Sequence, residues 1–496
     1  MPTPGTWIRR AWFTVPIAAV AILAGCAVGP DYQRPDLSAM PATYSPATNG
    51  WKVAEPRADF PKGNWWEVFQ DLELNALENS ANTANQELKS ALAAFDQARS
   101  FLDLARSGYF PAVSLNPSVT RQRDSANRPV NGVSNNKSET YNTFTVPLDL
   151  TYELDVWGRV RRTVEAARAT LQADAADVQS VRLAIQAEVA TDYFTLHALD
   201  EELALLRSNV EVFTKSLVLT QNRRAGGIAT DLDVSQAETI LKTTQAQLPV
   251  IALQRKKAEH ALAVLVGRPA PGFVVEEKPL HLEPPILPSG LPSELLERRP
   301  DIAASERRMA AANAGVGVAN AAFYPSLKLG ASAGLESVSA SSLFDWPSRL
   351  WSVGPSLSLP IFEGGANRAR LRQAKSAYEE VVANYRQNVL QAFAQVEDNL
   401  SAQSLLAVQQ EAQAAAVKSA RKTVEIASNR YQAGLVTYLE VATAQNAALD
   451  LERELVRLRG DQLVTSVALI KSLGGGWEAS QLPDKNSSST KSTVKK

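Results

Sequence analysis

The 496-residue sequence contains few residues of several kinds, and each shortage excludes a class of protein. A single Cys excludes an internal disulfide framework and a zinc site built from several Cys residues. Lys and Arg number 51 against 52 for Asp and Glu, and this net charge of −1 argues against nucleic acid as a partner, because binding it needs a basic surface. Beyond the N-terminal segment no run reaches about 18 consecutive apolar residues, so we expect no membrane-spanning helix in the mature chain.

Histidine is also scarce, and the positions of the three His residues argue against an enzyme. His197 falls in a long predicted helix, His260 in the helix that follows, and His281 in a Pro-rich connector. Side chains so far apart in the chain do not predict a shared metal site, and no other catalytic constellation accompanies them. We therefore predict no catalytic residues, no metal and no cofactor.

The first 26 residues have the pattern of a targeting signal. Arg9 and Arg10 precede an apolar run over residues 11–24, which is too short for an ordinary spanning helix. The run ends in Leu23-Ala24-Gly25-Cys26, which resembles the bacterial lipoprotein signal, in which the Cys is acylated and becomes the first mature residue. We predict a signal peptide over 1–25 and a lipid anchor at Cys26; the alternative is a plain signal peptide with an incidental Cys.

The rest of the chain contains two copies of one plan. A set of residues recurs at an offset of 207 positions: Asn222, Arg223, Gly227, Thr230, Leu232 and Val234 return as Asn429, Arg430, Gly434, Thr437, Leu439 and Val441. Short solenoid repeats run about 20 to 50 residues, so this longer unit is a duplicated half-molecule. We predict a lipidated segment over 26–74, a first repeat over 75–267, a Pro-rich connector over 268–293, a second repeat over 294–476 and a tail over 477–496.

Each half is predicted to contain a first helix, two strands, a very long helix and a returning helix. The first helix of the first half shows an unbroken heptad of apolar residues from Leu77 to Ala105. No Gly or Pro interrupts residues 159–225 or 366–433, so each stretch is predicted to be one helix. Helices of this length cannot be buried in one compact domain, since the mean is about 11–12 residues, and they predict a coiled coil or helical tube.

A glycine turn and a helix-start signal follow each long helix. Gly226 and Gly227 end the first, and Gly434 ends the second, as expected of C-caps. Thr230 to Asp233 and Thr437 to Glu440 then match the capping-box pattern. The returning helices are predicted over 231–267, with a kink at Pro249, and over 437–473, so that each half carries a long helical hairpin.

Four segments alternate between apolar and polar residues: 112–121, 143–154, 326–336 and 351–361. Their length suits transmembrane strands of about 9–11 residues. The alternative is two half-buried hairpins in a soluble protein, which Pro117, Pro147 and Pro355 favour because Pro weakens a central strand. Four strands cannot close a membrane barrel, and an open edge in hydrocarbon is excluded, so a barrel would have to be shared by two or three chains. The predicted fold class is mainly α with a membrane β-barrel.

At this point the sequence resembles the outer-membrane efflux factors of tripartite, RND-type pumps, the TolC and OprM family, in its lipoprotein branch. Six motifs in their joint order carry the resemblance: Val28-Gly29-Pro30-Asp31-Tyr32, Trp65-Trp66 with Phe69 and Asp71, Arg298-Arg299-Pro300-Asp301-Ile302, Phe323-Tyr324-Pro325-Ser326, Pro360-Ile361-Phe362-Glu363-Gly364-Gly365, and Leu473-Gly474-Gly475-Gly476-Trp477. The resemblance implies a homotrimer with a twelve-strand pore in the outer membrane and a helical tube in the periplasm. It also implies a periplasmic adaptor and an inner-membrane pump as partners, and a passive, gated exit duct that catalyses no reaction.

The resemblance further implies that acidic side chains just after the tip turns ring a closed aperture. The matching residues are Glu440 and Asp233, with Asp231 nearby. Three-fold symmetry would triple each carboxylate and favour cations over anions. The alternative role, which can coexist, is capping of helix N–H groups. Thr443 and Asn446 stand where many family members carry an Asp and some a basic residue, so the aperture could close differently.

The hairpin tips are the candidate contacts for the adaptor. These residues are Arg223, Arg224, Gly226, Gly227, Gly434, Leu435 and Val436, although turn geometry alone also explains the glycines. Metal-ion efflux and type I protein secretion compete with drug efflux as the system that the duct serves. The other classes that stay open are a structural periplasmic coiled-coil lipoprotein without a pore and a cell-envelope lipoprotein enzyme.

Overall fold

The computed structural model describes residues 27–33, 63–127, 138–278, 284–285, 298–478, 480 and 482. The predicted signal peptide, Cys26, His281, and most of the connector and tail lie outside these residues. The chain forms two compact units. Unit 1 comprises residues 1–35, 96–173 and 306–384, and unit 2 comprises residues 36–95, 174–305 and 385–496. Within the described part, no helix combines the length and hydropathy that crossing a bilayer requires.

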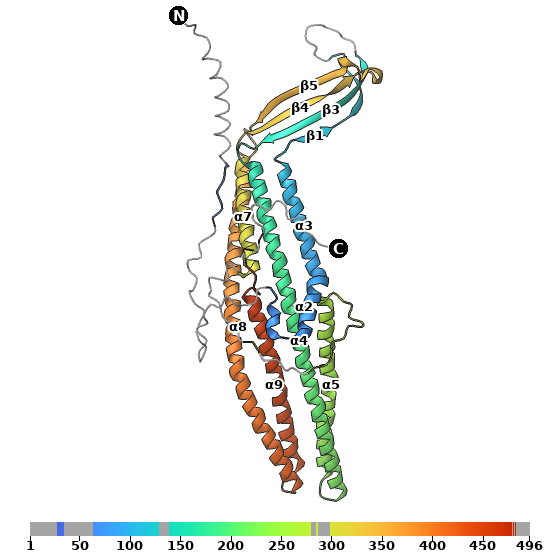
Figure 1. Cartoon of the computed structure of the whole chain (residues 1–496), viewed down its shortest axis with the longest axis vertical. Coiled ribbons are helices and arrows are strands. Elements are labelled where there is room, and N and C mark those ends of the chain that lie inside the picture. Colours follow the sequence, from blue (N-terminus) through green and yellow to red (C-terminus); the bar gives the residue numbers. More distant parts are fainter. Residues whose placement is uncertain are drawn as a thin grey trace. The chain divides into compact units, whose positions relative to one another are not determined.

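Helices make up most of the described chain (Figure 1). The α-helices are α2 (Leu72–Ala84), α3 (Gln86–Ser107), α4 (Arg159–Ala225), α5 (Asp231–Leu265), α7 (Pro300–Ala321), α8 (Ala366–Gln432) and α9 (Tyr438–Ser472). The two long ones, α4 and α8, have 67 residues each and fill the stretches without Gly or Pro. Glycines at positive φ flank them, because this left-handed conformation is costly for other residues: Gly158 and Gly365 lie before the helices, and Gly227 and Gly434 after them.

The first helix of the first half differs from the prediction of one unbroken heptad. It divides into α2 and α3 at Asn85, whose ψ of 131° is not helical. The Asn85 side chain caps the second piece, since its Oδ1 accepts from Leu88 N at 3.0 Å, and its Nδ2 donates to Leu265 O at 2.8 Å. A cap and a tertiary hydrogen bond therefore stabilise the break at Asn85. The heptad of apolar residues does not reveal the break, because it keeps the same phase on both sides.

The strands form one antiparallel sheet in unit 1, in the order β1-β3-β4-β5, with β2 also paired to β3. Their bounds are β1 Ala112–Leu115, β2 Ser118–Arg123, β3 Thr140–Leu154, β4 Ser326–Ser337 and β5 Arg349–Ser358. The predicted strand 112–121 is thus two strands, because Pro117 has no N–H for the ladder. The predicted strand 351–361 begins and ends earlier: Pro360 cannot donate to a ladder, and Ile361 is exposed.

Within the described part of the chain, no element covers one face of this sheet. Several of its large apolar side chains are exposed: Val113, Leu115, Val119, Trp351, Val353 and Leu357. The central pair runs in register from Phe144↔Ser337 to Leu154↔Leu327, so β3 from the first half joins β4 from the second. A continuous exposed apolar surface of this kind indicates contact with lipid or another chain.

The core of unit 2 explains three of the sequence motifs. Trp65 and Trp66 are fully buried in a cluster with residues of α2, α4, α5 and α9. Three successive glycines, 474 to 476, all have positive φ and turn the chain after α9. Trp477 then packs against Ala176, Ala303 and Ala304, and Arg299 donates to Ser472 O at the end of α9. These motifs therefore stabilise the core of unit 2.

Glu78 of α2 is buried in unit 2 and has no hydrogen-bond partner among the residues that the structure describes. Its exposed fraction is 0%, and neither carboxylate oxygen accepts a hydrogen bond. Burial raises the pKa of this carboxyl from an ordinary 4.5 to about 9, because the charged form loses its water without gaining a donor. Glu78 is consequently a neutral acid at neutral pH, at a cost in folding free energy.

Candidate functional site at the hairpin tips

The first tip joins α4 to α5 and has the turn and cap that its sequence predicts. Ile228 N donates to Arg223 O at 2.9 Å, and Gly227 has a φ of 74°. Thr230 and Asp233 form a complete capping box: Asp233 N donates to Thr230 Oγ1 at 3.3 Å, and Thr230 N donates to Asp233 Oδ2 at 2.9 Å. The start of α5 is therefore satisfied within its own hairpin.

The second tip joins α8 to α9 and differs from the prediction. Gly434 repeats the turn, with a φ of 76°, and Leu435 N donates to Arg430 O at 2.9 Å. Thr437 makes no side-chain cap hydrogen bond, so the predicted capping box is wrong here. Instead, Tyr438 N donates to Asp233 Oδ1 of the first tip at 3.1 Å. One hairpin caps the returning helix of the other.

Asp233 is the centre of this contact. It is 8% exposed and accepts three hydrogen bonds, two from Thr230 and one from Tyr438. Burial alone would raise the pKa of the Asp233 carboxyl, but these hydrogen bonds outweigh it, and the nearby Arg223 adds to them, so its pKa lies below the ordinary range. The carboxylate is ionised at neutral pH and is held between the two hairpins.

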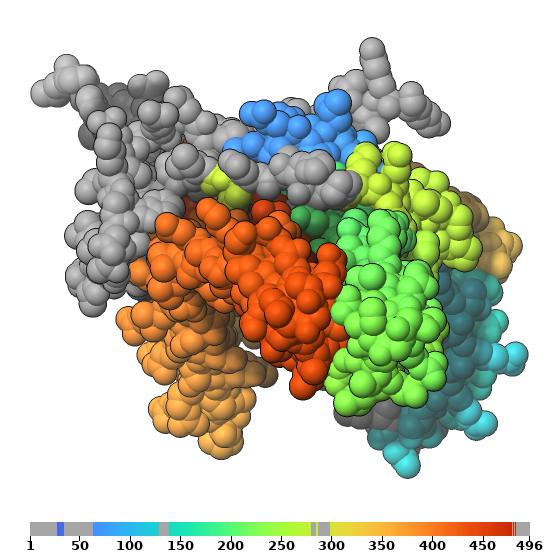
Figure 2. Space-filling view, turned by 90° about the horizontal axis from the view of Figure 1, so that it is seen from below, coloured from blue at the N-terminus to red at the C-terminus, as the bar shows by residue number. Residues whose placement is uncertain are grey.

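Arg223 makes a second link between the tips. Its Nη1 donates to Gln432 O at 2.9 Å, and its guanidinium lies 4.9 Å from the centroid of the Tyr431 ring. Tyr431 in turn contacts Tyr438 edge to face, with centroids 5.4 Å apart. Arg223 was a candidate adaptor contact by position, and the structure places it against the neighbouring tip. Figure 2, which views the molecule from below, shows the two tips side by side.

The other predicted aperture residues are exposed. Glu440 is 51% exposed and pairs with Arg430 of its own hairpin at 3.4 Å. Asp231 is 78% exposed and pairs with Arg224. Ion pairs in water contribute about 1 kcal/mol or less, so both carboxylates keep most of their freedom to meet ions or a partner. Thr443 and Asn446 are also exposed on α9.

Both tips also expose apolar side chains. Four large apolar side chains of the two tips are exposed: Ile228, Leu232, Leu435 and Leu439. Gly226 and Gly227 are exposed beside them. Among the residues that the structure describes, no group of three or more His, Cys, Asp or Glu side chains could hold a metal ion. The site is thus a pair of linked turns with apolar side chains and flanking ion pairs.

The family model described as outer membrane efflux protein matches residues 77–268 and 291–475. The chain belongs to the outer membrane efflux protein family. The resemblance seen in the sequence is therefore confirmed, as is the mainly helical fold with a strand region.

Relatives of this outer membrane efflux protein match over nearly their whole length. It is 32% identical to the outer membrane protein OprJ of Pseudomonas aeruginosa, over 95% of this chain and 97% of OprJ. It is 33% identical to the toluene efflux pump outer membrane protein TtgF of Pseudomonas putida, over 93% and 96% of the two chains. The solved outer-membrane channel OprN has a TM-score of 0.84 and 32% identity, over 91% of this chain and all of that one. The protein is thus an outer-membrane efflux component.

Proposed function

We propose that the protein is the passive exit duct of a tripartite efflux pump, working as a homotrimer in the outer membrane. The exposed apolar face of the sheet is the observation that carries this proposal. In the described chain, β5 pairs only with β4, while β1 and β2 pair only with β3, so a backbone edge remains on each side. Three chains with four strand positions each would close these edges into a twelve-strand barrel.

The membrane anchor and the partners belong to the same proposal. Acylation at Cys26 would attach the mature chain to the outer membrane. Because one acyl chain alone binds only weakly, the barrel would supply the rest of the membrane affinity. The two tips would meet a periplasmic adaptor that connects to an inner-membrane RND-type pump. Their apolar side chains and the exposed turn glycines suit a close backbone contact. No reaction, metal or cofactor is part of this function.

Two kinds of acid would operate the aperture. Glu440 and Asp231 are exposed and would supply the negative charge that attracts cations. Asp233 and Arg223 would hold the second hairpin against the first, so that the aperture stays closed until the adaptor separates the tips. The buried position of Asp233 supports a holding role over a charge directed into the passage.

The purified trimer in planar bilayers tests the charge at the aperture. Glu440→Ala is expected to raise the leak conductance and weaken block by divalent cations, because three carboxylates leave one axis. Asp450→Ala is the matched control, since Asp450 is an exposed acid further along α9. Equal conductance and equal block in wild type and Glu440→Ala would remove Glu440 from the aperture. A wild-type protein with no conductance in any condition would instead support the structural lipoprotein.

Capture of the adaptor would name the transported class. Leu435→Cys places a thiol at the exposed second tip, and the only natural Cys is the one proposed to be acylated. Cross-linking in cells is expected to capture an adaptor of a drug pump. An adaptor of a metal-ion pump or a type I secretion system would redirect the assignment. Gln413→Cys, on α8 away from the tips, is the control and should capture none.

A further inference from the structure

The segment of residues 27–33, here called the strap, is docked on unit 1. Val28 N donates to Trp157 O at 3.1 Å, just before α4. Asn313 of α7 donates from Nδ2 to Pro30 O at 2.9 Å, and Tyr32 Oη donates to Glu306 Oε1, also of α7, at 2.6 Å. The strap contains the first sequence motif of the mature chain, and it contacts one helix from each half of the duplicated sequence.

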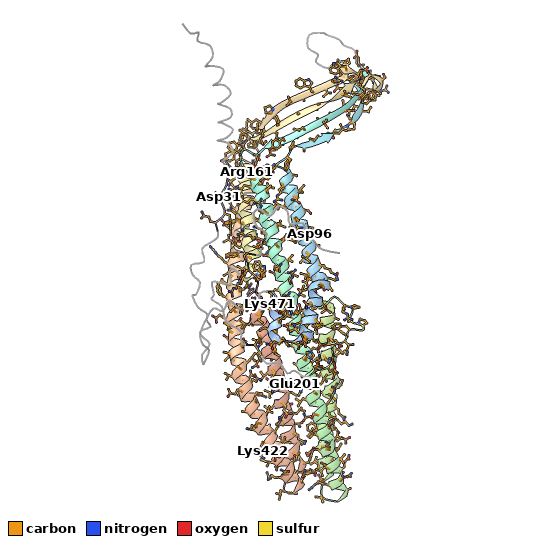
Figure 3. The ribbon with its side chains drawn as sticks, in the orientation of Figure 1. Asp31, Asp96, Arg161, Glu201, Lys422 and Lys471 are labelled. Carbon is orange, nitrogen blue, oxygen red and sulfur yellow. The ribbon has the colours of Figure 1, made fainter. Side chains whose placement is uncertain are left out.

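A buried arginine depends on the strap. Arg162 of α4 has a side chain that is 5% exposed, and its Nη2 donates to Asp31 Oδ1 at 2.8 Å and to Gly29 O at 3.4 Å. Its Nη1 donates to Glu165 at 2.8 Å. Figure 3 labels Asp31 beside the beginning of α4. The strap supplies both acceptors of Arg162 Nη2, so docking satisfies one side of this guanidinium, while the Asp31 side chain is 90% exposed.

Glycine backbones form the seat of the strap. Gly29 has a φ of 103°, and a Cβ there would lie 2.6 Å from Gly317 Cα of α7. Gly158 has a φ of 80°, and a Cβ there would lie 2.8 Å from Ala27 Cβ. Both distances are shorter than a carbon contact allows, so the strap fits only while these positions have no side chain.

The seat of the strap lies next to the two short connections that join β3 to α4 and α7 to β4. β3 ends at Leu154 just before α4, and β4 begins at Ser326 just after α7. Trp157 also joins the two, since its Nε1 donates to Pro325 O at 2.8 Å and its ring stacks on Tyr324 with centroids 4.7 Å apart. The strap thus begins beside the start of the β3–β4 pair, which is the pairing between the two halves, and then follows α7 from Gly317 back to Glu306.

We infer that the strap is an intramolecular assembly clamp. Once docked, it holds the beginning of α4 against the end of α7, so that β3 and β4 pair in register before the protomer meets its neighbours. A chain with an undocked strap is still acylated but forms trimers poorly. The last step rests on the proposed trimeric channel, whereas docking itself concerns the single chain.

The experiment compares two glycines with the same backbone conformation. Gly29→Val places a side chain against Gly317, while Gly63→Val carries the same positive-φ strain, at 101°, with open space around it. In full-length, acylated protein, Gly29→Val is expected to lower the yield of heat-modifiable trimers by about tenfold or more, and Gly63→Val by much less. Asp31→Asn, which removes the negative charge beside Arg162 but keeps the shape of the side chain, should give an intermediate loss. Palmitate labelling should be equal in all of them.

A peptide in trans separates docking from general misfolding. In a second variant, residues 27–33 are replaced by a Gly/Ser stretch of equal length, and a labelled peptide of the sequence Ala27–Gln33 is added during refolding. The peptide is expected to bind this chain and to restore trimers, and its Gly29→Val form should do neither. Wild-type trimer yield from Gly29→Val, or a peptide that neither binds nor restores, would overturn the inference. Peptide binding by a chain whose wild-type form makes no trimer would sink the proposed function and leave the clamp standing.

Discussion

The two hairpin tips have the same plan at an offset of 207 residues, yet they use their acids differently. Asp233 is buried and accepts hydrogen bonds from both hairpins, whereas Glu440 at the matching place is exposed and pairs with Arg430 of its own hairpin. The matching arginines differ in the same way: Arg223 donates to a backbone oxygen of the second tip, whereas Arg430 pairs with Glu440 in its own hairpin. Duplication has therefore produced one tip that holds and one tip that is held.

A third position shows how the difference arose. Tyr438 is the first residue of α9 and is buried, while the matching residue of α5, Asp231, is exposed. The aromatic ring at 438 contacts Tyr431 and brings the start of α9 within reach of the Asp233 carboxylate. Asymmetry in one pair of positions thus lets a local cap serve two helices.

The largest change is expected from removing the shared cap. Asp233→Ala removes the carboxylate that accepts from Thr230 at the start of α5 and from Tyr438 N at the start of α9, so it should lower the free energy of unfolding by about 2–4 kcal/mol. It should also raise channel conductance more than Glu440→Ala does, because the tips separate. Asp231→Ala, at an exposed acid of the same turn, is the control for urea unfolding and for bilayer recordings. Equal effects of the two substitutions would contradict the division into a holding and a held tip.

The pH dependence follows from the lowered pKa of Asp233. A depressed pKa means that its stabilisation is present above the unfolded value of about 3.9 and is lost as pH falls through the lower folded value. Wild-type conductance should therefore rise only in strongly acidic solution, and Asp233→Asn should show a raised conductance already at neutral pH. A recording series from pH 7 downwards measures both, and a wild-type rise near pH 6 would point to another group.

Glu78 is at least as buried as Asp233, but in the described part of the chain no donor hydrogen-bonds its carboxyl group. Because the pKa of Glu78 is raised, stability depends on pH in the opposite direction. Stability is complete below the unfolded pKa of about 4.5 and is lost as pH rises toward about 9. Glu78→Gln should therefore increase the free energy of unfolding at pH 8 by about 1–3 kcal/mol, with a gain that shrinks toward pH 4. Glu87→Gln, on the exposed face of α3, should leave it unchanged in the same thermal or urea series.

The smaller effects concern the arginines of the tips. Arg223→Lys keeps the charge but loses the planar contact with Tyr431, so we expect a loss of about 1 kcal/mol and a modest rise in conductance. Arg430→Lys alters a solvent-exposed pair and should change stability by about 0.5 kcal/mol or less. A larger effect of Arg430→Lys than of Arg223→Lys would reverse the asymmetry that the structure shows.

Much of the fold could be predicted because its signals are local. The ends of α4 and α8 follow from glycines beside stretches without Gly or Pro, and the cap of α5 follows from Thr230 and Asp233, three residues apart. The break at Asn85 could not be predicted, because Asn also occurs inside helices and the heptad of apolar residues keeps its phase across this position. The division of the first strand at Pro117 was underestimated for the same reason: alternation continues on both sides.

The contacts between the two tips could not be predicted, because they join residues that are far apart in the sequence. The hydrogen bond from Tyr438 to Asp233 joins residues 205 positions apart, and that from Arg223 to Gln432 joins residues 209 apart. Both accept or donate through backbone groups, which carry no residue-type signal. The sequence pattern at Thr437 even favoured a local cap, which the structure replaces with a partner from the other hairpin.

The two edges of the sheet bear on how many copies of the chain could close a ring. One edge is the interrupted pair β1 and β2, and the other is the continuous β5, so a contact between copies would join unlike surfaces. Such a head-to-tail junction does not limit the number of copies by itself; only the rotation from one copy to the next does. An even number of strand positions in each copy keeps every junction antiparallel, whatever the ring size. The strands therefore permit any ring, and the three copies of the proposed channel would have to be selected by contacts elsewhere in the chain.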